Sequence, residues 1–252
     1  MISVCVAVHR VHAAPNAASL RAQLDAALGG EQGELVLALN GVALASLGVE
    51  AEVRGVELGV NRGVAPAWNA AARDASGEIL VFCNDDVELG EGSLARLAAA
   101  LRELPGAVVG PVGSRWDMRL GRHLDWVGPF EDAEHPPQRC EVVSGFLFAC
   151  ARSTWEAVGG FDEFYAPASW EEVDFCAAVK ARGGGCFVIS AVECRHEWGV
   201  SRRQPPWARA RWDGRSETWR SIHRRNKAHF LEKWSGRGEG TAGGAVGGDP
   251  PR

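Results

Sequence analysis

Short apolar runs alternate with helical patterns over the first 112 residues of this 252-residue chain. Each run is bounded by polar residues and is too short for a buried helix, which favours strands of a parallel sheet covered on both faces. The predicted strands are residues 2–8, 34–39, 53–58, 79–83 and 108–112. Helices are predicted between them at 16–28, 65–75 and 93–104. The alternation predicts βαβ units in an α/β domain.

The pattern is less regular from residue 114 onward. Residues 114–140 are rich in Trp, Gly, Pro and charge, and predict a loop with short strands. Beyond them we expect a strand over 138–150 interrupted at Ser144–Gly145, a helix over 170–181, short strands over 186–190 and 192–196, and a basic amphipathic helix over 217–234. Residues 236–252 are Gly-rich without aromatic residues, and predict a disordered tail.

The predicted strand at 79–83 runs into two neighbouring carboxylates, Asp85 and Asp86. Ligands of open α/β sheets bind beyond the carboxyl ends of the strands. Two adjacent carboxylates repel each other unless a cation lies between them, and a hard divalent ion with phosphate oxygens in its shell meets that need. The alternative is an acidic turn that ends the strand and caps the next helix. This stretch alone leaves both interpretations open.

A second acidic group starts the helix predicted at 170–181. On a helix Glu171 and Asp174 share a face, whereas Glu172 points about 100° away from Glu171. The helix dipole explains one carboxylate at an N-terminus, and general-base chemistry is the alternative for the group. His196 ends a short predicted strand and is either a structural residue or a ligand. Its spacing from Cys194 matches no structural zinc pattern.

The charge distribution and the cysteine content indicate the kind of binding partner and the cellular compartment. The net charge is −5, yet residues 195–233 carry 11 Lys or Arg against 4 Asp or Glu. That segment indicates a local anionic partner, such as a diphosphate or an anionic lipid surface, rather than nucleic acid. The seven cysteines form no CxxC pair, and no apolar segment reaches the roughly 18 residues of a membrane span. We therefore expect a cytoplasmic protein, with any membrane contact being peripheral, at the inner face.

Five motifs in order resemble the family 2 glycosyltransferases of the GT-A fold, and most closely the rhamnosyltransferase-like group. The motifs are Asn61-x-Gly63-x5-Asn69, Asn84-Asp85-Asp86, Gly159-Gly160-Phe161-Asp162, Glu171-Glu172-Val173-Asp174 and His196-x2-Gly199-x-Ser201. The resemblance implies a single GT-A domain over 1–235, with a Rossmann-like, mostly parallel sheet flanked by helices. Its nucleotide-sugar-binding half would cover about 1–113 and its acceptor and catalytic half about 114–235.

The resemblance also implies roles for individual residues. Asp86 and His196 would hold Mg²⁺ or Mn²⁺, and Glu172, with Glu171 and Asp174 beside it, would supply the catalytic base. The nucleotide would be bound by Asn61, Gly63, Asn69, Asn84 and Asp85, with Asn40 as a further contact. Trp170 and Phe161 would help to form the acceptor pocket. The reaction would be an inverting transfer from a nucleotide-diphosphate sugar to a saccharide or lipid-linked saccharide, in the synthesis of surface polysaccharide or another glycoconjugate.

Two positions depart from the family pattern. Leu39 stands where the family usually has an Asp that reads the nucleobase, and Glu172 stands where it usually has Asp. These departures permit an alternative function, a catalytically degenerate carbohydrate-binding protein. A sugar nucleotidyltransferase is a third interpretation, but that class opens with a Gly-rich triphosphate loop and residues 8–12 contain no glycine.

Overall fold

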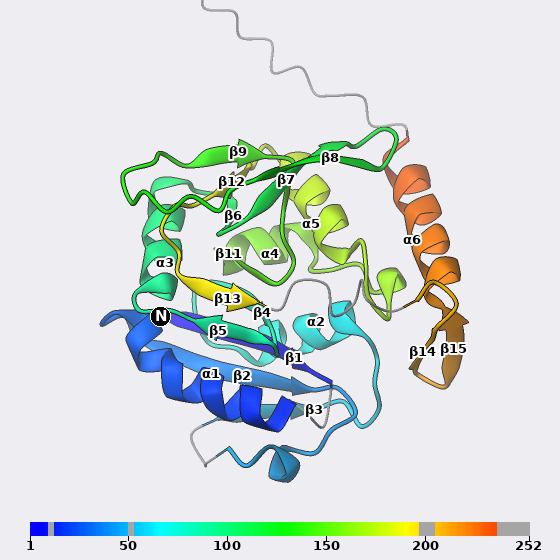
Figure 1. Cartoon of the computed structure of the whole chain (residues 1–252), viewed down its shortest axis with the longest axis horizontal. Helices are drawn as coiled ribbons and strands as arrows, with labels where there is room; N and C mark the ends of the chain where they lie inside the picture. The colour runs from blue at the N-terminus through cyan, green and yellow to red at the C-terminus, as the bar shows by residue number, and fades with distance from the viewer. Residues whose placement is uncertain (10–12, 50–52, 197–204, 236–252) are drawn as a thin grey trace, which may run out of the picture.

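The computed structural model describes residues 1–9, 13–49, 53–196 and 205–235, and is built on a sheet of eight strands in the order β3-β2-β1-β4-β11-β6-β12-β9 (Figure 1). Four neighbouring strands from the first half are parallel, namely β3 (Arg54–Glu57), β2 (Gly33–Leu39), β1 (Ile2–Val8) and β4 (Ile79–Asn84). β11 (Leu147–Ala151) runs antiparallel between β4 and β6 (Val108–Gly110), and β12 (Cys186–Val188) continues the sheet to β9 (Gln138–Cys140). The mostly parallel α/β sheet predicted from the sequence is confirmed.

Helices cover both faces of this sheet, which explains why its central strands are almost entirely apolar. Along β1, Val4, Val6 and Val8 face one core layer and Cys5 and Ala7 face the other. The first layer is closed by α1 (Ala13–Leu28), η1 (Leu44–Leu47) and α3 (Ser93–Glu103). The second is closed by α2 (Val64–Asp74), α4 (Arg152–Val158), η2 (Glu163–Tyr165), α5 (Glu171–Lys180) and α6 (Trp219–Trp234).

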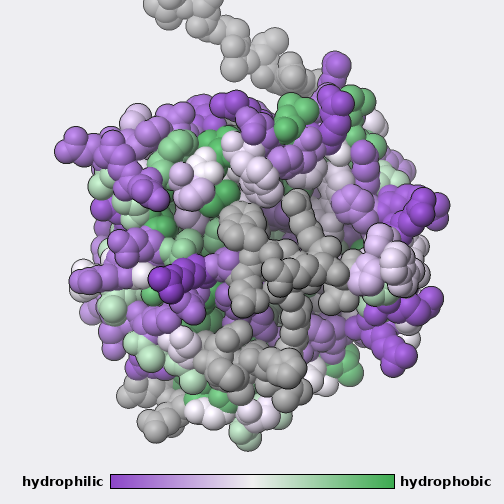
Figure 2. Space-filling model, viewed as in Figure 1, coloured by the Kyte–Doolittle hydropathy of each residue, from purple (hydrophilic) through white to green (hydrophobic). Residues whose placement is uncertain are grey.

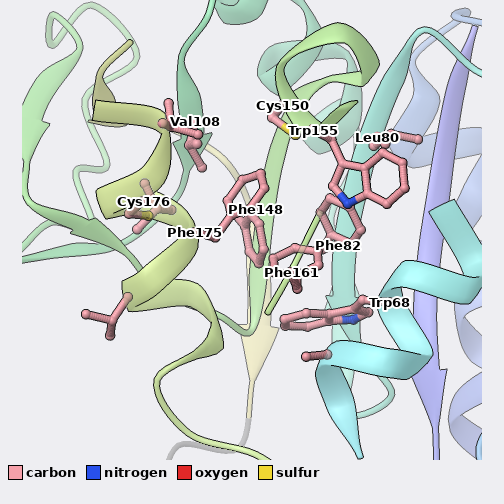
Figure 3. Packing of buried hydrophobic residues seen from close by; sticks show 14 of the residues in the cluster. Trp68, Leu80, Phe82, Val108, Phe148, Cys150, Trp155, Phe161, Phe175 and Cys176 are labelled. Atoms are coloured by element: carbon pink, nitrogen blue, oxygen red, sulfur yellow. The ribbon is translucent and has the colours of Figure 1, made fainter. Parts of the chain in front are cut away.

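The second core layer is built around aromatic rings, as Figure 3 shows. Phe82 on β4 meets Phe161 edge-on at 4.7 Å and Phe148 on β11 at 5.2 Å. Trp68 on α2 packs 5.3 Å from Phe161. Phe161 is 3% exposed, so it is a core residue and does not line an acceptor pocket as expected.

The region after residue 112 differs from the sequence prediction in its pairing. The single interrupted strand expected at 138–150 is three strands, of which β10 (Val142–Val143) leaves the main sheet. It joins β7 (Gly113–Asp117) and β8 (Arg122–Val127), a hairpin inside the stretch expected to be mostly loop. The break at Ser144 allows this exchange, since its N–H donates to Val112 at 2.9 Å instead of continuing a ladder.

Two short two-stranded sheets complete the fold. β13 (Cys194–His196) pairs antiparallel with β5 (Val87–Leu89), and β14 (Arg209–Trp212) with β15 (Arg215–Thr218). The β14–β15 hairpin was not predicted, and it delays the start of the expected C-terminal helix to Trp219. The tail predicted at 236–252 lies outside the described residues. No helix within the described ranges is both long and apolar enough to cross a bilayer.

Candidate active site

A pocket of about 490 Å³ lies at the carboxyl ends of β1, β2 and β4. Both halves of the chain line it. The first half contributes Ala7, His9, Asn40, Asn61, Gly63, Val64, Asn84, Asp85 and Asp86, and the second half contributes Pro167, Ala168, Arg209, Ala210, Arg211 and Trp219. The predicted nucleotide-side residues Asn40, Asn61, Gly63, Asn84 and Asp85 are thus brought together with Asp86.

His196 is brought beside Asp86 by the pairing of β13 with β5, in which His196 stands opposite Val87. Its Nε2 lies 3.3 Å from Asp86 Oδ1, and its ring stacks on Phe146 with 4.6 Å between centroids. The Asp86 oxygen is buried and accepts no hydrogen bond from any described residue. Leaving a buried carboxylate oxygen without a donor is costly, so this geometry suits a cation between oxygen and imidazole nitrogen.

The donor set of this pair fits a divalent metal that a substrate also ligates. Within the described ranges, no group of three or more His, Cys, Asp or Glu side chains is arranged to hold a metal ion. Mg²⁺ and related ions commonly use one or two protein carboxylates and take their remaining oxygens from substrate phosphates and water. Asp86 and His196 would therefore hold the metal together with a diphosphate. Asp85 lies on the pocket wall, where its Oδ2 accepts the His9 N–H at 3.3 Å.

Asn40 and Asn61 shape another part of the pocket wall. Asn40 is 2% exposed, donates to the Gly63 carbonyl at 3.1 Å and accepts the Arg62 N–H at 2.6 Å. Asn61 donates to the Arg211 carbonyl at 2.8 Å, and the Asn61 carbonyl accepts the Asp213 N–H at 2.7 Å. Asn61 therefore fastens the β14–β15 hairpin over the pocket.

Gly63 lies against Pro167, where there is no room for a side chain. A Cβ here would lie 2.7 Å from Pro167 Cα and 2.8 Å from the Pro167 oxygen. The φ of 98° is also in the region that favours glycine. Gly63 lines the pocket, but its lack of a side chain accommodates Pro167.

Asn69 does not line the pocket. It is 1% exposed, donates to the Phe161 carbonyl at 2.8 Å and accepts the Phe161 N–H at 2.8 Å. A third bond joins it to Glu163 Oε1 at 3.0 Å. Its polar atoms thus tie α2 to the segment around Phe161, and we assign it a structural role.

The three carboxylates at the start of α5 have different surroundings. Glu171 is 7% exposed, and burial, followed by the neighbouring Glu172 charge, raises its pKa well above 4.5. Glu172 is half-buried and lies over Gly145, where an added Cβ would come 3.3 Å from its Cγ. The next residue, Phe146, accepts the Asn84 N–H at 2.9 Å. Glu172 is therefore close to the end of β4 that carries Asp85 and Asp86.

Asp174 holds the C-terminal helix in place. Its Oδ2 lies 2.8 Å from Lys233 Nζ, and its Oδ1 accepts from Trp234 Nε1 at 2.8 Å and Tyr165 Oη at 3.2 Å. The prediction that it joins the catalytic group needs correction, since both oxygens are engaged by structural partners and its side chain is 4% exposed. Trp170 is also buried, at 3% exposed, and donates to His223 Nδ1 at 3.2 Å.

Comparisons with known proteins indicate the family that the chain resembles. The sequence model of the glycosyl transferase family 2 matches residues 44–151. A probable N-acetylgalactosaminyltransferase 9 of Caenorhabditis elegans is 26% identical over 205 residues, which are 73% of this chain and 34% of that protein. The resemblance to family 2 is confirmed. The rhamnosyltransferase-like subgroup stays a prediction.

Solved structures show the same fold. GalNAc-T7 with UDP, GalNAc and Mn²⁺ matches with a TM-score of 0.66 and 16% identity, over 94% of this chain and 48% of that one. The Pyrobaculum calidifontis mannosyltransferase PcManGT with GDP-Man and Mn²⁺ matches with a TM-score of 0.55 and 20% identity, over 80% of this chain and 58% of that one. The fold is GT-A. The chain spans about a third of the C. elegans relative and about half of GalNAc-T7.

Most of the pocket wall formed by the β14–β15 hairpin was not predicted from the sequence. Arg211 and Trp219 were not considered, although both line the pocket. The sequence did contain a hairpin signal, since Asp213-Gly214 is a dipeptide that type I′ turns prefer. Both residues have positive φ angles in the structure, 45° and 72°.

Proposed function

We propose that this chain is an inverting, metal-dependent glycosyltransferase that moves a sugar from a nucleotide-diphosphate sugar to an acceptor hydroxyl. The observation that carries the proposal is the Asp86–His196 pair in a pocket that also gathers Asn40, Asn61 and Asp85. The acceptor would be a saccharide or lipid-linked saccharide, in polysaccharide or glycoconjugate synthesis at the inner face of a membrane. The neighbours' UDP, GalNAc and GDP-Man support a nucleotide-sugar donor but differ in sugar and base, so they select neither.

The residues divide the chemistry between two sides of the site. Glu172 takes the proton of the acceptor hydroxyl as its oxygen attacks the anomeric carbon, and the bond to the diphosphate breaks on the opposite side of that carbon. The metal, when bound, neutralises charge on the departing diphosphate. The pocket-lining Arg209 and Arg211 add positive charge at the mouth. We assign the base to Glu172, because Glu171 is buried and its pKa is raised well above 4.5, whereas Glu172 is half-buried.

The test begins with a thermal-shift screen of nucleotide sugars with Mn²⁺, since a bound donor stabilises the folded state. The best donor is then assayed for release of nucleoside diphosphate. Asp86→Ala should reduce release at least about a hundredfold, because it removes a metal ligand. Glu88→Ala is the matched control: it removes an exposed carboxylate two residues away on β5 and should retain activity.

The result also decides between the enzyme and the carbohydrate-binding alternative. Donor turnover lost in Asp86→Ala and kept in Glu88→Ala supports the enzyme. A protein that free oligosaccharides stabilise, but that neither binds nor turns over any nucleotide sugar, would be the carbohydrate-binding protein instead.

A further inference from the structure

The β7–β8 hairpin exposes large apolar side chains beside positive charge. Leu120 is 55% exposed, Leu124 53% and Trp126 42%, so three of the most exposed large hydrophobic residues described lie within seven positions of the chain. Arg119 and Arg122 are exposed on the same hairpin. Figure 2 shows green, hydrophobic side chains among purple ones along the edge over this hairpin. We call Arg119, Leu120, Arg122, Leu124 and Trp126 the hairpin surface.

Leu124 stands at a β-bulge. Arg115 pairs with Asp125 and the next residue, Trp116, pairs with His123, so Leu124 is an extra residue on β8 without an opposite partner. Bulges re-aim side chains and are features of a fold rather than defects. Without the extra residue, the register would turn the following side chains to the other face of the hairpin.

The tip of the hairpin is fixed on the body of the protein. Gly121 is buried, and a Cβ there would lie 3.0 Å from the Trp170 ring and 3.4 Å from Leu231 on α6. The Leu120 N–H donates to Asp117 Oδ1 at 3.0 Å, which shapes the turn. Because the backbone is anchored through Gly121, Leu120 cannot be buried by folding the tip inward.

We propose that the hairpin surface docks the protein on an anionic lipid bilayer. Leucine side chains that insert at the acyl boundary, a Trp at the headgroup level and flanking arginines are the combination that peripheral membrane surfaces use. Charge complementarity favours anionic lipid. Arg115 and Asp125 pair at 3.7 Å and offset each other, whereas the exposed Arg119 and Arg122 give the tip a positive charge. A second copy of this chain is the competing occupant.

The docking would orient the proposed acceptor side of the molecule. The tip packs on Trp170, which immediately precedes Glu171 and Glu172. A bilayer under the hairpin would thus lie near the predicted base, where a lipid-linked saccharide could reach it. Only this consequence rests on the proposed function, since the docking itself requires no donor or metal.

The experiment is co-sedimentation of the purified chain with vesicles of phosphatidylcholine, with and without phosphatidylglycerol. The wild type should bind the anionic vesicles, and binding should weaken as salt is raised. The double variant Leu120→Ser with Leu124→Ser should weaken binding at least about tenfold. Arg119→Gln with Arg122→Gln should weaken it roughly fivefold per arginine and flatten the salt dependence. Val60→Ser, which removes a 49% exposed apolar side chain elsewhere, should bind like the wild type.

Three outcomes would overturn the proposal. They are no binding of the wild type to either vesicle, equal binding by the double serine variant, and an equal loss in Val60→Ser. Gel filtration adds a fourth: a dimer that the double serine variant dissociates, without vesicle binding, would make the hairpin surface a contact between copies of this chain. Donor turnover in solution should be unchanged in the double variant, so failure of docking is distinguishable from failure of the enzyme.

Discussion

His196 Nε2 lies 3.3 Å from Asp86 Oδ1, although the two residues come from opposite halves of the chain. Neither residue alone defines a metal site. The contact exists because β13 pairs with β5 in one register, and a shift of one residue would turn His196 to the other face. The pairing of two three-residue strands therefore determines whether the site can form.

Replacement of His196 should reduce metal affinity more than it reduces stability. We expect His196→Ala to weaken Mn²⁺ binding in the presence of nucleoside diphosphate by at least about tenfold, because a nitrogen ligand is lost. Electron paramagnetic resonance titration of free Mn²⁺ measures this without relying on turnover. Phe146→Leu is the control, since it removes the ring that stacks on His196 but keeps the ligand. Equal affinity in His196→Ala and the wild type would remove His196 from the metal site.

Glu172 and Glu171 can be separated by paired substitutions. Glu172→Gln should lower the rate of transfer by about 10²–10⁴-fold while donor affinity stays near the wild-type value, because only proton removal is lost. Glu171→Gln should retain most of the transfer rate, since burial raises the pKa of Glu171 and favours its neutral carboxyl, which the amide resembles. Steady-state transfer and donor titration on both variants provide the measurement. The reverse pattern would make Glu171 the base.

The sequence predicts only some of the polar residues of the site, namely those that lie at the ends of strands. The carboxyl ends of parallel strands meet at one edge, so Asp85, Asp86 and Asn40 could be placed together from apolar runs alone. Asn69 and Asp174 resembled site residues equally well. Their structural role depends on Phe161, Lys233 and Trp234, and nothing local in the sequence announces those distant partners.

The same limit applies to the second half of the fold. β9, β10 and β11 form one apolar stretch in the sequence. β10 nevertheless pairs in a different sheet from β9 and β11, and strand propensity does not predict which sheet a strand joins. The β7–β8 hairpin was obscured because its exposed apolar residues break the alternation that marks a half-buried strand.

Glu171 should make stability depend on pH in a defined direction. Its pKa is raised in the folded protein above its ordinary value of 4.5, so the folded state binds this proton more tightly than the unfolded state. The contribution is fully present below pH 4.5 and is lost as the pH rises toward the folded pKa, by up to about 1.4 kcal/mol per pH unit. Urea unfolding across this range should show a shallower decline in Glu171→Gln than in the wild type. The exposed Glu103→Gln, by contrast, should decline as the wild type does.

Alanine substitutions at two glycines with positive φ should distinguish the cost of backbone strain from the cost of a steric clash. Gly63 (φ 98°) faces Pro167, whereas Gly48 (φ 62°) has no atom within 4 Å of an added Cβ. Gly48→Ala should cost about 1–2 kcal/mol of unfolding free energy, the price of a left-handed conformation for an L-residue. Gly63→Ala should cost more, because the added carbon would lie 2.7 Å from Pro167 Cα, and backbone must move to relieve it. Chemical denaturation of both variants measures the difference.

Since Pro167 lines the pocket, Gly63→Ala should also weaken donor binding while Gly48→Ala should not. Equal costs for the two substitutions would show that Pro167 yields readily, and that Gly63 is needed only for its backbone conformation.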